Sequence, residues 1–327
     1  MKKTLTLSIS AALLASSMSA LAAPEQPKGK LECIAPADPG GGWDFTCRQF
    51  ASALRQEGLI DKGMQTVNMT GAAGGVAFAH VVSKREGDAG LIVAASSSNA
   101  TRLAQNQYPG MDENDVTWIG TLGADYAVIA ARSDYQYDSI TEVVDSIKDN
   151  PKSVKFAGGS GILGWDQLNL LQVLNTGGVQ VDSLKKLTYL DFNNGATAIT
   201  QILGGHLDIV VGDMSEVTSF LESGDLKVLA VLAEKRLPAP YAEIQTAKEQ
   251  GINVVAPNWR GFYMPANVSE DERQYWINNL NAVYESDYWK DIMKKNALSP
   301  FNISGPQLDE FLTHQIGEIR SIFKILR

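Results

Sequence analysis

The chain has 327 residues, of which 37 are acidic and 28 basic, so its formal net charge at pH 7 is −9. Hydrophobic residues make up 44% of it, and this length and composition suit a globular protein of two domains. The acidic balance, with no stretch rich in lysine and arginine, argues against nucleic acid as a partner.

The first residues have the pattern of a removable secretory signal. Lys2 and Lys3 form a basic start, an uncharged apolar stretch runs from Leu5 to Met18, and small residues follow up to Ala22. A transmembrane anchor is the alternative, but the stretch is shorter than the ~20 residues that a span needs. No cysteine stands at the cleavage point to carry a lipid. We expect residues 1–22 to be removed and the mature protein to be exported.

The next segment reads as strand, glycine loop and helix. Residues 31–35 are an apolar run, Gly40, Gly41 and Gly42 follow, and apolar residues then recur at helical spacing from Cys47 to Leu54. Glycines without Cβ atoms let backbone N–H groups at a helix N-terminus approach an anion. The alternative is that the loop is merely a tight turn. We expect a carboxylate or phosphate site here, with unusual dihedral angles at Gly41.

Cys33 and Cys47 are the only cysteines, and they lie on either side of this loop. In an exported protein a disulfide between them is favoured over two free thiols. It would fix the start of the helix against the end of the strand. A metal site is disfavoured, because none of the three histidines stands at a ligand spacing from another or from a cysteine.

The same strand, loop and helix unit recurs along the chain, with loops of Gly, Ser or Asn. Such alternation predicts an α/β fold with parallel sheets covered by helices, and places the loops at the carboxyl ends of the strands, where ligands bind. The expected strands are 65–70, 90–95, 154–157, 186–190, 207–211 and 227–232; the expected helices are 76–83, 165–174, 196–203 and 215–223.

One tripeptide occurs twice at an expected helix start, as Gly42-Trp43-Asp44 and Gly164-Trp165-Asp166. The functional interpretation is that two lobes each present a helix N-terminus and a tryptophan to a shared cleft. The alternative is chance, since Asp is favourable in a first helical turn in any case. Asp44 is also placed to pair with Arg48 four residues later.

Four motifs in order resemble the solute-binding components of tripartite tricarboxylate transporters, the receptors of the Bug type. They are Pro39-Gly-Gly-Gly-Trp-Asp44 with Arg48, Asn68-Met-Thr-Gly-Ala-Ala-Gly-Gly75, residues 195–208 and Trp259-Arg-Gly-Phe-Tyr-Met-Pro265. The resemblance implies a type II periplasmic binding protein with two lobes and a ligand cleft between them. It also implies a carboxylate ligand held largely by backbone N–H groups, and delivery to a membrane permease of one large and one small subunit.

The chain departs from many relatives in the second lobe. Where they read Ser-Gly-x-Gly-Ser-x-x-His, this chain has Leu163, Gly164 and Gln167 after Ser160-Gly161-Ile162, and Asp88-Ala-Gly-Leu91 replaces the common Asp-Gly-Tyr-Thr. With the cysteine pair and the first-loop tryptophan, these differences resemble the citrate branch. We expect citrate or a related tricarboxylate as ligand, with a dicarboxylate or other small carboxylate as the alternative.

Chain flow in such proteins crosses twice between lobes. We place the first lobe at 23–124 with 254–327 and the second at 125–253, because residues 120–125 follow the last expected strand of the first lobe and 253–259 precede the closing helices, expected at 270–286 and 307–323. The protein is expected to be a monomer without a cofactor.

Loop glycines, hydroxyls and amides are the expected ligand donors. Arg102 and Arg260 are further charge partners, with a solvated surface position as the alternative, and Asp213 either accepts a ligand hydroxyl or caps the next helix. We expect the loop backbone at Gly41 to matter more for binding than Arg260. The candidate ligand-binding residues are Gly40, Gly41, Gly42, Trp43, Asp44, Ser96, Ser97, Ser98, Asn99, Ser160, Gly161, Gly164, Trp165, Asn193, Asn194, Gly195 and Asp213.

Enzymatic function is not expected. The chain has no Gly-x-Ser-x-Gly elbow, no phosphate-binding Gly-x-x-x-x-Gly-Lys-Ser/Thr loop and no His-Glu-x-x-His helix. A secreted hydrolase with carboxylates assembled in space is one alternative, and a structural protein without a small ligand is another.

Overall fold

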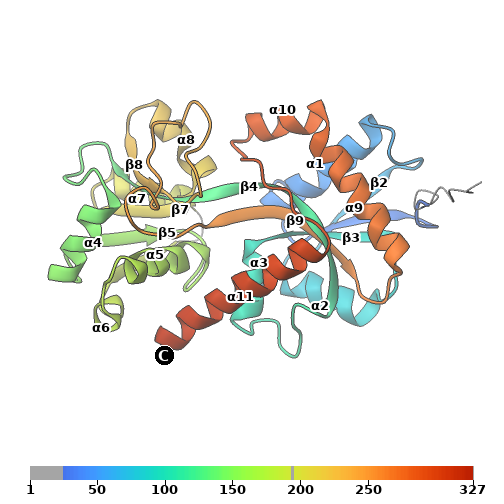
Figure 1. The fold of residues 1–327 in the computed structure, drawn as a ribbon, viewed down its shortest axis with the longest axis horizontal. Helices are drawn as coiled ribbons and strands as arrows, with labels where there is room; N and C mark the ends of the chain where they lie inside the picture. The colour runs from blue at the N-terminus through green and yellow to red at the C-terminus, as the bar shows by residue number, and fades with distance from the viewer. Residues whose placement is uncertain (1–24, 193–194, 327) are drawn as a thin grey trace, which may run out of the picture.

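The computed structural model describes residues 25–192 and 195–326. It shows two α/β lobes side by side, joined by the long strand β4, which belongs to both, with β9 beside it (Figure 1). The expected signal at residues 1–22 lies outside the described residues. Among the helices that are described, none is long and apolar enough to cross a membrane.

The first lobe is built on a mixed sheet with the strand order β2-β1-β3-β9-β4. Its first three strands are parallel, whereas β9 runs antiparallel to both β3 and β4. The strands are β1 (Leu31–Ala35), β2 (Met64–Asn68), β3 (Leu91–Ser96), β9 (Pro257–Pro265) and the first part of β4 (Val116–Arg132); the helices are α1 (Gly42–Gln56), η1 (Ala72–Gly74), α2 (Gly75–Lys84), α3 (Ser97–Ala104), α9 (Glu270–Glu285), α10 (Asp287–Lys295) and α11 (Pro306–Leu326).

The second lobe continues from the far part of β4. There β5 is parallel to its neighbours β6 and β7, and β4 is antiparallel to β7 and β8. The strands are β5 (Lys155–Gly158), β6 (Thr188–Asp191), β7 (Ile209–Asp213) and β8 (Leu226–Val231); the helices are α4 (Ile140–Asp149), α5 (Trp165–Thr176), α6 (Val181–Leu184), α7 (Gly195–Leu203) and α8 (Met214–Glu222).

The chain first passes from one lobe to the other within strand β4, and not in a connection after a strand as we expected. Strand β4 pairs with β9 from Val116 to Tyr126 and with β7 from Ala127 to Ala131, so one continuous strand belongs to both sheets. Residues 120–125, expected to follow the last strand of the first lobe, lie inside β4. Gly123 has φ +134 at a shift in the strand register, so this glycine marks a bulge and not a strand end. Residues 125–253 stay our proposed extent of the second lobe.

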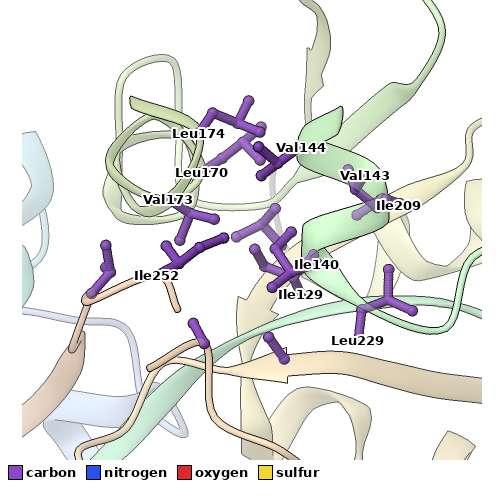
Figure 2. Close-up of a cluster of buried hydrophobic side chains, with 14 of the residues drawn as sticks. Ile129, Ile140, Val143, Val144, Leu170, Val173, Leu174, Ile209, Leu229 and Ile252 are labelled. Atoms are coloured by element: carbon purple, nitrogen blue, oxygen red, sulfur yellow. The ribbon is translucent and has the colours of Figure 1, made fainter. Parts of the chain in front are cut away.

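Each lobe has its own apolar core. In the second lobe, α4 and α5 pack on the sheet through Ile129, Val143, Leu170 and Ile209, which are buried (Figure 2). Helix α4, which the sequence analysis did not predict, is held at its start by Ser139, whose hydroxyl accepts a hydrogen bond from the N–H of Glu142. Because each lobe packs around its own core, the two lobes can form the two sides of one cleft.

Helix α11 links the lobes along one side. It packs against α3 of the first lobe and α5 of the second (Figure 1). Leu308, Leu312, Ile316 and Ile319 recur at helical spacing and are buried. The C-terminal helix therefore packs against both lobes.

Candidate functional site

The first glycine loop joins β1 to α1 and points its helix N-terminus at the space between the lobes. Gly40 has φ +88, the left-handed region that favours glycine, whereas Gly41 is extended with φ −72 and ψ 165. Our expectation of unusual dihedral angles at Gly41 was wrong by one residue. The N–H of Gly40 donates to Asp44 Oδ2 at 2.9 Å and that of Gly41 to the carbonyl of Asp38 at 3.0 Å.

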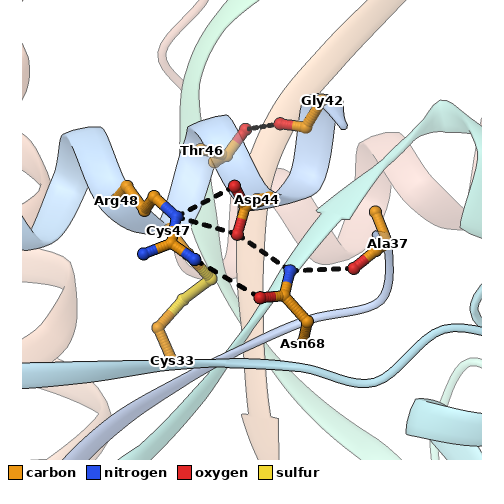
Figure 3. Close-up of a disulfide and its surroundings, with 8 residues drawn as sticks. All are labelled: Cys33, Ala37, Gly42, Asp44, Thr46, Cys47, Arg48 and Asn68. Carbon is orange, nitrogen blue, oxygen red and sulfur yellow. Dashed lines mark hydrogen bonds and ion pairs between the residues drawn. A yellow bond between two sulfur atoms is a disulfide. The ribbon is translucent and has the colours of Figure 1, made fainter. Parts of the chain in front are cut away.

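Asp44 is the internal anchor of this loop (Figure 3). Besides Gly40, its carboxyl accepts hydrogen bonds from Arg48 Nε at 2.9 Å and from Asn68 Nδ2 at 2.8 Å. The hydrogen bond from Arg48 is the main cause that lowers the pKa of Asp44 to about 2, and the backbone N–H of Gly40 adds to it. Asp44 is therefore ionised and engaged within its own loop.

Cys33 in β1 and Cys47 in α1 form a disulfide, with a Cα to Cα distance of 5.7 Å (Figure 3). This confirms the predicted pairing. Both residues are fully buried in the core between the sheet and α1. The bond ties the helix to the strand on the two sides of the glycine loop.

The second lobe repeats this arrangement. The N–H of Gly159 donates to Asp166 Oδ2 at 2.7 Å, as Gly40 does to Asp44. The two tryptophans also match, because the indole Nε1 of Trp43 donates to Ser96 Oγ at 3.2 Å and that of Trp165 donates to Asp213 Oδ1 at 2.9 Å. The repeated tripeptide therefore stands at a helix start in both lobes, although its glycine is the first residue of α1 and the N-cap of α5.

Asp166 has no arginine in the place that Arg48 takes beside Asp44. Its residue is 5% exposed, and no ion pair to it is found among the described residues. Burial raises its pKa well above the usual range, and the nearby charges of Asp213 and Glu216 raise it further. The two aspartates thus accept similar backbone hydrogen bonds, but the pKa of Asp44 is lowered and that of Asp166 is raised.

A cavity of about 210 Å³ lies where the two lobes meet. The N-termini of α1 and α3 face it from the first lobe, the loop before α5 and the start of α8 face it from the second, and β9 closes it. This volume lies below the roughly 300–1,000 Å³ of pockets that hold drug-sized molecules, so only a smaller ligand would fit. The lining residues are Gly42, Trp43, Ser96, Ser98, Gly159, Ser160, Trp165, Asp166, Asp213, Glu216, Asn258 and Arg260.

Larger hollows lie elsewhere. One of about 700 Å³ is lined by Leu221, Lys227 and Tyr241 of the second lobe, and one of about 810 Å³ lies between α8 and the residues after α10. Neither has helix N-termini that converge on it. Of the residues that the structure describes, no three His, Cys, Asp or Glu are arranged to hold a metal ion.

The segment 96–99 divides between the cavity and the fold. Ser96 caps α3 by accepting from the N–H of Ser98 at 3.2 Å, and both line the cavity. Ser97 Oγ donates to the carbonyl of Pro257 at 2.7 Å, and Asn99 Oδ1 accepts from the N–H of Ser96 at 3.0 Å. Ser97 and Asn99 are fully buried and hold the helix start in place.

The two candidate arginines differ in what they contact. Arg102 donates from Nη1 to Gln105 and Gln107, both at 3.0 Å, and from Nη2 to the carbonyl of Ser160 in the other lobe at 3.3 Å. Arg260, on β9, makes no side-chain hydrogen bond or ion pair with any residue in the described ranges, and its guanidinium lies beside Gly42 in the cavity wall. With no hydrogen-bonded partner among the residues that the structure describes, the Arg260 guanidinium can meet a ligand, while its charge also acts on Asp213 nearby.

Asp213 both begins α8 and lines the cavity, so the two interpretations of it are compatible. Its Oδ2 accepts from Asn258 Nδ2 at 2.5 Å. Burial raises the pKa of Asp213, and Arg260 counteracts part of this rise. Behind it Asp125, 1% exposed, accepts hydrogen bonds from the N–H and hydroxyl of Ser215.

Of the candidate ligand residues and the two candidate arginines, the following fall on the cavity wall: Gly42, Trp43, Ser96, Ser98, Ser160, Trp165, Asp213 and Arg260. Gly40, Gly41, Asp44, Ser97, Asn99, Gly161, Gly164, Gly195 and Arg102 are not among its lining residues. Asn193 and Asn194 lie outside the described residues.

Sequence reasoning missed Asp166, Glu216 and Asn258 as lining residues, whereas Gly159 lies within the segment 158–165 that was expected to supply N–H donors. For Asp166 a signal existed in the repeated tripeptide. Glu216 stands three residues after Asp213 and its Oε2 accepts from the N–H of Asp213 at 3.1 Å, a spacing typical of a helix start. Asn258 has no local signal, because only the course of β9 brings it to the cavity.

Comparison with known proteins identifies the protein family of this chain. Residues 50–326 match the family described as the tripartite tricarboxylate transporter family receptor. A UPF0065 protein of Bordetella pertussis is 24% identical over 296 residues, covering 89% of this chain and 87% of that protein.

Two solved structures share the fold. A TctC solute-binding protein from Polaromonas has a TM-score of 0.78 at 21% identity, covering 92% of this chain and 99% of that one. MatC from Rhodopseudomonas palustris with bound malate has a TM-score of 0.70 at 14% identity, covering 90% and 98%. The match over most of the chain shows that this protein belongs to the receptor family of tripartite tricarboxylate transporters.

Proposed function

We propose that this receptor captures citrate or a related tricarboxylate in the cavity between its lobes, in the periplasm, and delivers it to a membrane permease of one large and one small subunit. It acts as a monomeric binding protein and carries out no catalysis. Residues 1–22 direct its export and are cleaved near Ala22.

The observation that carries the proposal is the free guanidinium of Arg260 among helix N-termini. The first N–H groups of a helix have no partner within it, and they favour an anion together with the helix dipole. Gly42 and Trp43 bring such groups from α1, and Trp165 brings one from α5, and all three residues line the cavity together with Arg260. One carboxylate can therefore meet the arginine while another meets a helix start.

The expected hydrogen-bond energies are large enough for micromolar binding of the ligand. Hydrogen bonds to charged groups contribute about 1.5–3 kcal/mol each, and micromolar affinity needs about 8 kcal/mol after association costs. A dicarboxylate is the second candidate, favoured by the structural neighbour that holds malate. It needs one carboxylate contact fewer.

A thermal-shift screen of organic acids tests the proposal. Citrate at about 100 times its dissociation constant should stabilise the fold by about 2.7 kcal/mol. Arg260→Ala should weaken binding at least tenfold, whereas Arg236→Ala, at an exposed arginine paired with Glu249, should leave it unchanged. If no di- or tricarboxylate raises the melting temperature, the proposal is wrong. Product formed from a tested acid would instead favour the hydrolase alternative.

A further inference from the structure

The second-lobe wall of the cavity carries three carboxyl groups, which repel a polycarboxylate ligand wherever they are ionised. Asp166, Asp213 and Glu216 line it, and of the described residues that line the cavity Arg260 is the only lysine or arginine. Two like charges about 5 Å apart repel by about 3 kcal/mol at an effective dielectric constant of about 20. A fully ionised ligand would therefore lose much of what Arg260 and the helix termini provide.

The carboxyl group of Glu216 lies close to the first residue of α7. A Cβ atom on Gly195, the first residue of α7, would meet Glu216 Oε1 at 2.5 Å, and one on Gly212 would meet Oε2 at 2.6 Å. The glycines at these positions make room for a carboxyl group. Since this helix start already faces a carboxyl of the protein, a ligand carboxylate placed there would meet a like charge.

Asn258 supplies an independent sign of what the ligand brings. Its residue is 9% exposed, it lines the cavity, and its Nδ2 is bound to Asp213. Its Oδ1 is buried without a hydrogen-bond partner among the residues that are placed. An unpaired buried acceptor is costly and calls for a donor. A ligand hydroxyl or a protonated carboxyl group can supply one, whereas an ionised carboxylate group cannot.

We propose that the cavity takes its ligand as a partly protonated acid, with one proton shared between a ligand carboxyl group and the wall formed by Asp213, Glu216 and Asn258. The inference rests on the proposed function and adds the chemical form of the ligand. The proton comes from water or from the ligand in solution, and no other bond is made or broken. Arg260 and the first-lobe helix termini hold a second, ionised carboxylate.

The titration behaviour of the wall agrees with this geometry. Burial raises the pKa of Asp125 to about 8 and, together with the charge of Asp213, that of Glu216 to about 7. A bound anion raises these values further, so protons are taken up where the free carboxyls are ionised. The charged and titratable groups that face the wall are Asp125 on β4, Asp166 on α5, Tyr189 on β6, Asp213 at the end of β7, Glu216 on α8 and Arg260 on β9.

Calorimetric titration with citrate at pH 8.5 measures the proton directly, in two buffers of small and large ionisation enthalpy that carry no carboxylate or phosphate. Free citrate is essentially ionised there, since ordinary carboxyl pKa values lie near 4. We expect the difference in heat to correspond to about one proton taken up per citrate. The dissociation constant should rise by about tenfold per pH unit above pH 8.

Glu216→Gln keeps the shape of the side chain and removes a titrating group, so it should reduce proton uptake and flatten the pH dependence. Asp145→Asn, at an exposed position on α4, should change neither. Citrate binding with no proton uptake and a constant affinity between pH 6.5 and 8.5 overturns the inference, as does binding that requires Mg²⁺. In either case the proposed function stands, whereas the failure of every carboxylate to bind contradicts the proposed function itself.

Discussion

Asp44 and Asp166 hold equivalent places in the two lobes, each accepting a hydrogen bond from the backbone of the glycine loop before its helix, at 2.9 Å from Gly40 and 2.7 Å from Gly159. Arg48 neutralises the first, whereas the second is buried beside other carboxyls. At the start of α1, the charge of Asp44 is therefore balanced by an arginine. At the start of α5, the carboxyl group of Asp166 has no such partner among the described residues, so the two sides of the cavity differ in charge.

The asymmetry predicts opposite effects of removing each charge. The folded-state pKa of Asp44, about 2, is below its usual 3.8, so its stabilisation is complete above about pH 4 and is lost as the pH falls towards 2. Asp44→Asn should lower the free energy of unfolding by about 1.5–3 kcal/mol at pH 7, and the loss should vanish near pH 2. Denaturant melts over this range measure it.

Asp166→Asn is the matched variant. Its folded-state pKa is raised, so ionisation weakens the fold as the pH rises above the usual value of 3.8, and the amide removes that effect. The variant should be at least as stable as the original at pH 8. Equal destabilisation by the two substitutions would show that the lobes do not differ in charge compensation.

The disulfide should contribute mainly to folding. It closes a loop with a sequence separation of 14, which corresponds to about 3 kcal/mol in the chain-entropy account. Replacing both Cys33 and Cys47 with Ala should lower the unfolding free energy by about this amount and leave the order of ligand preference unchanged. In the exported protein, mass spectrometry should find both thiols protected from alkylation until a reductant is added. Free thiols there would contradict the pairing.

Local patterns predicted the elements well where a strand, a glycine loop and a helix follow one another. β1 has the expected bounds, and β5, α5, α7 and β8 lie within two residues of theirs. A continuous strand that belongs to two sheets has no loop residues that mark the passage from one sheet to the other. The first crossing was therefore expected at residues 120–125, which lie inside β4, because a bulge glycine and a loop glycine look alike in sequence.

The cavity wall was predicted only in part, for a related reason. Loop glycines and serines announce a helix start, but sequence does not say which of them turn towards the other lobe. Asp44 and Asn99 are engaged within their own loops, whereas Glu216 and Asn258 reach the cavity through packing of distant segments. Our expectation that Gly41 would matter more than Arg260 is replaced by one that centres on Gly42 and Arg260.

Gly42→Val tests the first-lobe wall. A Cβ on Gly42 would lie 3.4 Å from Arg260 Nη1, so a valine there would narrow the cavity and displace the guanidinium. Gly42 is within α1, whose backbone accepts any residue, so the fold should persist. We expect at least a tenfold loss of citrate affinity by calorimetry, about 1.4 kcal/mol. Gly317→Val in α11, where a Cβ meets no atom within 4 Å, should bind normally; comparable losses in both variants would count against this wall.

The final prediction concerns two hydrogen bonds that join the lobes beside the cavity. Gln105 Nε2 in the first lobe donates to the carbonyl of Leu163 in the second at 2.5 Å, next to the bond from Arg102 to Ser160. These donors hold the loop before α5 against the end of α3. Because ligand binding needs both walls, the contact favours the closed arrangement in which they meet.

Gln105→Ala should weaken this contact, and the lobes should separate more readily. We expect a larger radius of gyration without ligand by small-angle scattering, a return towards the original value with saturating citrate, and a faster dissociation rate. Gln107→Ala is the matched control, because Gln107 accepts from the same Arg102 but makes no hydrogen bond with the described part of the second lobe. If Gln105→Ala leaves both the scattering and the dissociation rate unchanged, closure does not depend on this pair, and the helix termini with Arg260 must draw the lobes together through the ligand alone.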